Sequence, residues 1–190
     1  SLPQFLQQQL EPKKGVVIEI PKDLQAFEDY NNIPVDASNI KELANPFSYK
    51  ADQGVKVAEH QGAHYYTIGQ RKGLHIGGRP KPSFVIGLDV DSNLVYSGQT
   101  DEHHGLNRWA LRIDRDDFHF ISSRYNLNKL HELECDLRIR YRQKLQRGTV
   151  YVKDDAVYLL FKEKQRGITP GQFAAIYIGE ELVASGIIKH

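Results

Sequence analysis

The feature that most restricts the fold of this chain is a series of short strand-forming segments between Trp109 and the last residue. Each segment is rich in β-branched and aromatic residues and is bounded by turn-forming residues, and no helical periodicity separates one segment from the next. The six segments are WALRID, ECDLRIRYR, TVYVK, AVYLLF, FAAIYIG and ELVASGIIK. Six strands without intervening helices predict an antiparallel six-stranded β-barrel in a C-terminal domain of residues 106–190.

A smaller β-rich unit is predicted before this barrel. GVVIEI at 15–20 has the composition of a buried strand. SFVIGLDV at 83–90 and LVYSG at 94–98 are separated by the turn-forming residues DSN, which predicts a β-hairpin. We therefore expect a mainly β protein with two small β-rich units, the first of them a central domain at 55–105.

The remaining N-terminal segments are interpreted as connections. Residues 1–20 are expected to be the end of a linker, with a short helix at 5–10, followed by the first strand. Residues 21–54 are polar and contain several asparagines and prolines, which is typical of an insertion or linker. Within them, DASNIKELA carries a helix-start signal, with Ser38 as the expected N-cap.

Composition restricts the cellular setting. The sequence has no apolar run of about eighteen residues and no secretory signal, which predicts a soluble, cytoplasmic protein that does not span a membrane. The single cysteine, Cys135, cannot form an internal disulfide. Its place in a predicted strand makes it a buried, poorly nucleophilic thiol with a normal or raised pKa.

Positive charge is concentrated in two places, although the net charge is only +1. Four basic and no acidic side chains lie between His60 and Leu88, and five basic and one acidic lie between Asp136 and Arg147. Local charge of this kind suits a specific polyanion better than general attraction to one. The alternative is that both places are merely solvated faces.

The first basic segment contains the glycine-rich stretch YYTIGQRKGLHIGG at 65–78. Its glycines allow positive φ and close approach of the backbone, while Gln70, Arg71 and Lys72 supply hydrogen-bond donors. Neither a Walker loop nor a dinucleotide-binding fingerprint is present. The pattern indicates an anion-binding loop, and a glycine-rich corner of a barrel is the alternative.

The second basic segment, RIRYRQKLQR at 138–147, lies at the end of a predicted strand. Arg138, Arg140, Arg142 and Lys144 recur with period two, so a continued strand would place them on one face. Arginine favours bidentate recognition of phosphate. The alternative is an edge strand whose charges prevent aggregation.

Four motifs resemble the tRNA-specific 2-thiouridylase family. AEHQGAHYYTIGQRKGLHIGG is similar to the family segment GEHxGxxxYTIGQRKGLGIGG, and CDLRIRYRQ, ITPGQFAAIY and GIIKH resemble later signatures in the same order. The resemblance runs from about residue 4 to the end. It implies an enzyme that replaces O2 of the wobble uridine of certain tRNA anticodons by sulfur, using ATP with magnesium and a cysteine persulfide.

The catalytic motifs of that family are absent from this sequence. No SGGxD motif occurs, and Cys135 matches a cysteine that opens a barrel strand in the family, not a catalytic one. The resemblance therefore implies the C-terminal portion of the enzyme, with no catalytic residue or cofactor of its own and no activity alone. ATP and a sulfur-donor protein are implied for the missing domain and the full enzyme.

The resemblance also implies which residues contact tRNA. Arg140 and Tyr141 match an Arg-Tyr pair of the family that contacts tRNA, and Gln172 matches a tRNA-contacting glutamine. Strict strand alternation would place Arg140 and Tyr141 on opposite faces, so the strand must end or bulge there unless one of them acts through its backbone. Further tRNA-contacting residues expected from charge and position are Gln70, Arg71, Lys72 and Arg142.

The sequence departs from the family pattern in places, and two other functions stay open. His75 stands where the family usually has glycine, which puts the path of the loop in question. DEHH at 101–104, with His119, is a candidate hydrolytic metal site, although adjacent histidines lack the spacing of a zinc-binding pair. A barrel that binds a protein partner, like the second domains of translation GTPases, is the other alternative.

Overall fold

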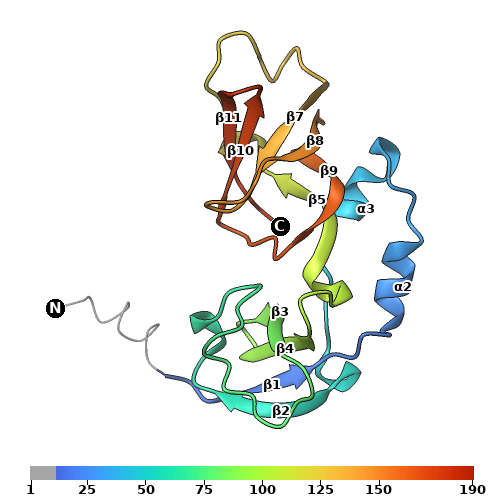
Figure 1. The fold of residues 1–190 in the computed structure, drawn as a ribbon, viewed down its shortest axis with the longest axis vertical. Helices are drawn as coiled ribbons and strands as arrows, with labels where there is room; N and C mark the ends of the chain where they lie inside the picture. Colours follow the sequence, from blue (N-terminus) through green and yellow to red (C-terminus); the bar gives the residue numbers. More distant parts are fainter. Residues whose placement is uncertain (1–11) are drawn as a thin grey trace, which may run out of the picture.

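The computed structural model describes residues 12–190, so the helix expected at 5–10 lies outside the described residues. Over this range the strands form two separate sheets, which lie at opposite ends of the long axis of the molecule (Figure 1). A segment with short helices runs along one side and connects the two units. The prediction of a mainly β protein with two β-rich units is confirmed.

The first unit contains a mixed sheet. Within the described residues its strands, in the order β2-β1-β4-β3, are β1 (Gly15–Glu19), β2 (Val55–His60), β3 (Ser83–Asp89) and β4 (Leu94–Gln99). β1 and β4 are parallel, whereas the other neighbours are antiparallel. The expected hairpin is the β3–β4 pair, and Asn93 in its turn has a φ of 56°, a left-handed conformation that asparagine tolerates.

Both faces of this sheet are covered, because strand alternation sends neighbouring apolar residues to opposite sides. Val17, on one face, packs in the same cluster as Leu74 from the glycine-rich stretch. Ile18, on the other face, packs in a cluster with Phe27 and Tyr49 from the connecting segment. The glycine-rich stretch is therefore held against the sheet by its own apolar residues.

The second unit is an antiparallel sheet curved toward a barrel. Over residues 12–190 it has seven strands, in the order β5-β9-β8-β7-β10-β11-β6. They are β5 (Asn107–Ile113), β6 (Phe118–Phe120), β7 (Glu132–Arg138), β8 (Gln146–Val152), β9 (Val157–Arg166), β10 (Phe173–Ile178) and β11 (Glu181–Ile187). Six of these correspond to the predicted strands, and the additional β6 has only three residues, too few for a visible alternation.

The ends of this second sheet come together near the C terminus. The Arg112 N–H of β5 donates to His190 O (2.9 Å), and the Lys189 N–H donates to Arg112 O (2.8 Å). These bonds place the residues after β11 beside β5. The inward-facing side chains, Cys135, Leu137, Ala174 and Ile176 among them, are fully buried.

The connecting segment between β1 and β2 contains α2 (Gln25–Asn31) and α3 (Ile40–Ala44). Short 3-10 turns in the described chain are η1 (Ala37–Asn39), η2 (Ala51–Gln53), η3 (Ala63–Tyr65), η4 (His104–Leu106) and η5 (Arg115–Asp117). The expectation that Ser38 is an N-cap is wrong, because the Asp36 carboxylate accepts from the Ser38 N–H (3.0 Å) and caps η1.

This connecting segment is tied to the second unit by buried polar groups. The Tyr30 hydroxyl donates to Leu43 O (2.7 Å) and accepts from the Trp109 N–H (2.9 Å). The buried Arg108 guanidinium donates to Ala44 O at the end of α3. The segment therefore packs as an ordered strap and fixes the position of β5.

No helix within residues 12–190 is long and apolar enough to cross a membrane.

The environment of Cys135 predicts an inert thiol. The side chain is fully buried, and burial raises the pKa of the thiol to about 12. At pH 8 only about one molecule in ten thousand would carry the reactive thiolate. We expect iodoacetamide to leave the folded chain unmodified and to alkylate it in urea, as mass spectrometry would show. Modification of the folded chain at the rate of an unfolded control would contradict this buried position.

Candidate functional site

The glycine-rich stretch forms a tight loop anchored on β3. The Gly69 N–H donates to Val85 O (2.8 Å), and the Val85 N–H donates to Gln70 O (2.9 Å). Gly69 and Gly73 have φ of 88° and 85°, in the left-handed region that a Cβ makes costly. His75 also has a positive φ, 52°, so a histidine here keeps a conformation typical of the glycine usually found in this position.

The polar residues of this loop have different roles. The Gln70 side chain closes the loop, because Oε1 accepts from the Thr67 N–H (3.1 Å) and Nε2 donates to Lys72 O (2.8 Å). Arg71 and Lys72 are exposed at the tip of the loop. The two interpretations of the stretch therefore apply to different residues: Gln70 and the glycines shape a corner, and the corner presents two cations.

The predicted strand ECDLRIRYR extends too far, and the expectation that its cations share one face is wrong. The strand ends at Arg138, and Arg142 has a φ of 63° in the turn that follows. Gln143 stabilises this turn, since its Oε1 accepts from the Ile139 N–H (2.9 Å) and its Nε2 donates to Gln165 Oε1 (2.9 Å). Hydrogen bonds from the Gln143 side chain thus take the place of further backbone pairing between strands. The four cations therefore do not share one face of a strand.

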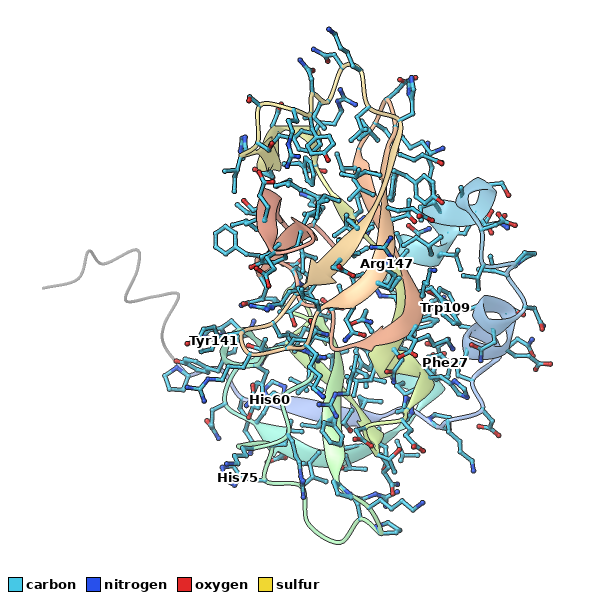
Figure 2. The ribbon with its side chains drawn as sticks, turned by 45° about the horizontal axis from the view of Figure 1, so that its top comes forward. Phe27, His60, His75, Trp109, Tyr141 and Arg147 are labelled. Atoms are coloured by element: carbon cyan, nitrogen blue, oxygen red, sulfur yellow. The ribbon has the colours of Figure 1, made fainter. Side chains whose placement is uncertain are left out.

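Arg140 and Tyr141 take different positions in this turn. The Arg140 Nη1 donates to Arg166 O (2.6 Å), and partial burial, together with the nearby Arg166 charge, lowers the pKa of Arg140. Tyr141 is 89% exposed, and the Arg142 guanidinium lies 5.4 Å from the centre of its ring. Figure 2 shows Tyr141 at the edge of the molecule, at the level where the second unit meets the first. Of the possibilities that strand alternation left open, the structure has the first, because β7 ends before Arg140.

The two basic segments meet at the boundary between the units. A Cβ placed on Gly69 would lie 3.6 Å from Gly167 Cα, and one placed on Gly167 would lie 3.8 Å from Arg140 Nη1. The single proton of the Thr169 hydroxyl is shared between Gly167 O (2.8 Å) and Ile68 O (3.3 Å), and the second, weaker contact joins the two units. We call residues 67–73, 139–143 and 166–173 together the junction surface.

Gln172 joins this surface through the pairing of β7 with β10. Ala175 pairs with Arg138, the last residue of β7, so Gln172 and Phe173 at the start of β10 lie at the same end of this strand pair as Arg140 and Tyr141, which follow β7. Gln172 is exposed, and its backbone carbonyl accepts from the Ile188 N–H (2.9 Å). The residues that the family resemblance indicates therefore come from adjacent strand ends.

Phe173 is a prominent residue of the surface that sequence reasoning missed. Its side chain is 68% exposed, whereas Ala174 and Ile176 are fully buried. The alternation in FAAIYI carried this signal, because buried positions at 174 and 176 require position 173 to face outward.

The charges of the surface are mostly uncompensated. Arg166 pairs with Asp101 (3.1 Å), and Arg79, further along the first basic segment, pairs with Glu19 (2.6 Å). Among the described residues, no carboxylate forms an ion pair with Arg71, Lys72, Arg140 or Arg142. Four cations are therefore available to an anionic ligand.

The alternative metal site at 101–104 does not assemble. The His103 Nε2 donates to Ile20 O (3.0 Å) and its Nδ1 accepts from the Gly105 N–H (3.0 Å), so both ring nitrogens are occupied. His119 lies on β6, paired with Ser185 of β11. In the part of the chain that the structure describes, no three His, Cys, Asp or Glu side chains gather in a way that could hold a metal ion.

Comparison with known proteins finds two matching domain families. A family described as the tRNA methyl transferase PRC-barrel domain matches residues 38–99, and one described as the aminomethyltransferase beta-barrel domain matches residues 112–188. The first includes the glycine-rich loop, and the second includes Arg140, Tyr141 and Gln172.

Similar full-length proteins carry the name tRNA-specific 2-thiouridylase MnmA. The protein from Christiangramia forsetii is 42% identical over 189 residues and that from Flavobacterium johnsoniae 40% over 190 residues, in each case over 99% of this chain. The protein from Halalkalibacterium halodurans is 40% identical over 150 residues, which are 77% of this chain and 38% of that protein. The chain spans about half of the first two relatives, 48% of each.

The loop geometry predicts that its glycines and its cations affect different properties. Gly73→Val should lower the free energy of unfolding by roughly 1–3 kcal/mol, because it forces a β-branched residue into the left-handed region. Its Cβ would also lie 3.3 Å from Gln70 Nε2. The double variant Arg71→Ala/Lys72→Ala removes only exposed side chains and should unfold in urea like the wild type. Equal stability of all three proteins would show that the loop needs no positive φ at Gly73.

Proposed function

This chain belongs to the tRNA-specific 2-thiouridylase family, and we propose that its junction surface binds tRNA for the sulfur-transfer reaction of that family. In this reaction O2 of the wobble uridine of the anticodon is replaced by sulfur. The proposal assigns tRNA contacts to Arg140, Tyr141 and Gln172, with further contacts from the loop at 70–72 and from Arg142. The names of the relatives, which describe tRNA-specific enzymes, support the choice of ligand.

The observation that carries the proposal is the meeting of two basic segments from different units. Arg71 and Lys72, exposed in the first unit, follow Gly69 within three residues, and Arg140 of the second unit lies beside Gly167, which contacts Gly69. A row of cations without carboxylate partners suits a phosphate backbone, which supplies much of the affinity of proteins for nucleic acid. A surface formed by two units also restricts binding to a polyanion of matching shape.

The individual side chains suit contacts with RNA. Arg140 is fixed by its bond to Arg166 O, so fewer rotamers are lost when its remaining N–H groups meet a phosphate. The exposed amide of Gln172 can both donate and accept hydrogen bonds, which suits phosphate, sugar or base edges. Gln70 shapes the loop through both ends of its amide, so its own contact with tRNA would come from the second Nε2 proton.

The described residues do not fit the chemical step. The glycine-rich loop closes on itself through Gln70, and no group of three His, Cys, Asp or Glu side chains within residues 12–190 could hold a magnesium ion. The buried Cys135 does not suit a persulfide carrier. We propose that ATP-dependent activation and sulfur transfer occur elsewhere in a cytoplasmic enzyme loaded by a sulfur-donor protein, and that this chain alone is inactive.

Removing charges from the junction surface should weaken tRNA binding. Arg140→Ala should cost about 1.5–3 kcal/mol of binding free energy, and Gln172→Ala about 1 kcal/mol. Arg71→Ala/Lys72→Ala should also flatten the dependence of log K on log salt, by about 0.7–0.9 for each phosphate that the variant no longer neutralises. The measurement is a titration of the 190-residue chain with tRNA at several salt concentrations.

A charge-matched control is available at a distance from this surface. Lys22 and Lys129 are both exposed, at the start of the strap and in the connection between β6 and β7, so Lys22→Ala/Lys129→Ala removes the same net charge. The proposal requires this control to retain affinity and salt dependence close to those of the wild type. Binding without a steep salt dependence, or an equal loss in control and site variants, would instead favour a barrel that docks on protein.

A further inference from the structure

We infer that Phe173 and Tyr141 form a stacking platform for unpaired RNA bases, so that the junction surface recognises single-stranded rather than double-helical RNA. The inference rests on the proposed function, because it assumes that the ligand is RNA. It adds the conformation of the RNA that is bound, and it gives a role to a residue that the family resemblance does not indicate.

The exposure of these two rings is the first observation. Among residues 12–190 they are the two most exposed of the large hydrophobic side chains, Tyr141 at 89% and Phe173 at 68%. Exposed aliphatic residues are scattered over the molecule, which is ordinary for a protein surface. Two largely uncovered aromatic rings on one surface suggest that a ligand covers them.

The position of the rings is the second observation. Ala175 of β10 pairs with Arg138, the last residue of β7, so Phe173 at the start of β10 and Tyr141 in the turn after β7 lie at the same end of this strand pair. The Arg142 guanidinium lies 5.4 Å from the centre of the Tyr141 ring. Exposed rings with arginines beside them in the chain suit single-stranded RNA, whose phosphates can meet the cations while its bases stack on the rings.

Comparison with Tyr177, another aromatic residue of β10, shows that the ring of Phe173 is uncovered. Tyr177 lies on the same face of the strand, and the Arg138 guanidinium covers it at 5.5 Å from the ring centre. Within the described part of the chain, Phe173 has no such cation and no aromatic neighbour. Ala175, between them on this face, has only a methyl side chain.

The geometry of paired RNA excludes it as the ligand of these rings. In an A-form helix the bases are stacked on one another, and the deep, narrow major groove keeps side chains from their faces. Bases in loops, at ends or flipped out of a stem present free faces. The platform therefore selects RNA segments whose bases are unpaired or can be unstacked at low cost.

The test compares Phe173→Leu, Phe173→Trp and Tyr141→Leu in the 190-residue chain, with Ile121→Ala as control. Ile121 is 60% exposed and follows β6, outside the junction surface. Each protein is titrated with tRNA, with an unstructured single-stranded RNA and with a blunt RNA duplex of equal length. Thermal unfolding checks that each variant keeps the fold, as expected for exposed positions.

Removing an aromatic ring should weaken RNA binding without changing the contribution that phosphate contacts make to the binding free energy. We expect Phe173→Leu and Tyr141→Leu each to reduce affinity for tRNA and for single-stranded RNA by about five- to a hundredfold, with the salt slope unchanged. Phe173→Trp keeps a stacking face and should retain affinity. Binding of the duplex and the behaviour of Ile121→Ala should match the wild type.

Arg140→Ala separates failure of this inference from failure of the proposed function. If Arg140→Ala weakens tRNA binding while Phe173→Leu and Tyr141→Leu behave like Ile121→Ala, the platform is overturned and the proposed function stands. If Phe173→Leu weakens duplex and single-stranded RNA equally, stacking on unpaired bases is also overturned. If neither Arg140→Ala nor the ring variants alter RNA binding, the proposed function itself fails and the exposed rings belong to a protein contact.

Discussion

The contact between two glycine backbones, Gly69 in the first unit and Gly167 in the second, is the contact on which the proposed binding surface depends. Both glycines have positive φ, 88° and 66°, a conformation that favours glycine, and a Cβ on either would lie in ordinary van der Waals contact with the other Cα, at 3.6–3.7 Å, so the two backbones lie side by side at this boundary. The Thr169 hydroxyl also lies 3.3 Å from Ile68 O across this boundary. Two basic segments about 70 residues apart in the sequence thereby become one surface, in which like charges must be held together by the fold.

The strap provides the second constraint on the position of the units. Arg108 is buried without a carboxylate partner, and burial lowers its pKa to about 10, which still leaves it protonated at neutral pH. Its charge is met by Ala44 O at the C-terminal end of α3 and by Ala110 O, acceptors that suit a cation at a helix end. Lys164 of β9 adds a bond to Asn31 Oδ1 (2.7 Å). The strap is thus packed on the second unit while its Phe27 covers the sheet of the first.

Sequence patterns predict the local features of this fold and miss the long-range ones. The alternation of apolar and polar residues, together with turn-forming residues, locates the strands, since both signals depend only on neighbours in the chain. The same alternation fails at RIRYR, where the pattern continues but Gln143 bonds to Ile139 and Gln165 and ends β7 at Arg138. The self-closing role of Gln70 and the meeting of the loop with Gly167 depend on contacts that no local pattern records. The domain boundaries and the tRNA contacts of individual residues stay predictions.

The central claim is that the loop, the turn after β7 and the segment before β10 act as one RNA-binding surface. Hydrogen exchange of the 190-residue chain, with and without saturating tRNA, tests it most directly, because it reports on each segment separately. The account predicts that amides in 67–73, 139–143 and 166–173 become protected together, at the same tRNA concentration, while the connection between β6 and β7 is unaffected. Protection confined to one unit, or centred on that distant connection, would contradict a shared surface.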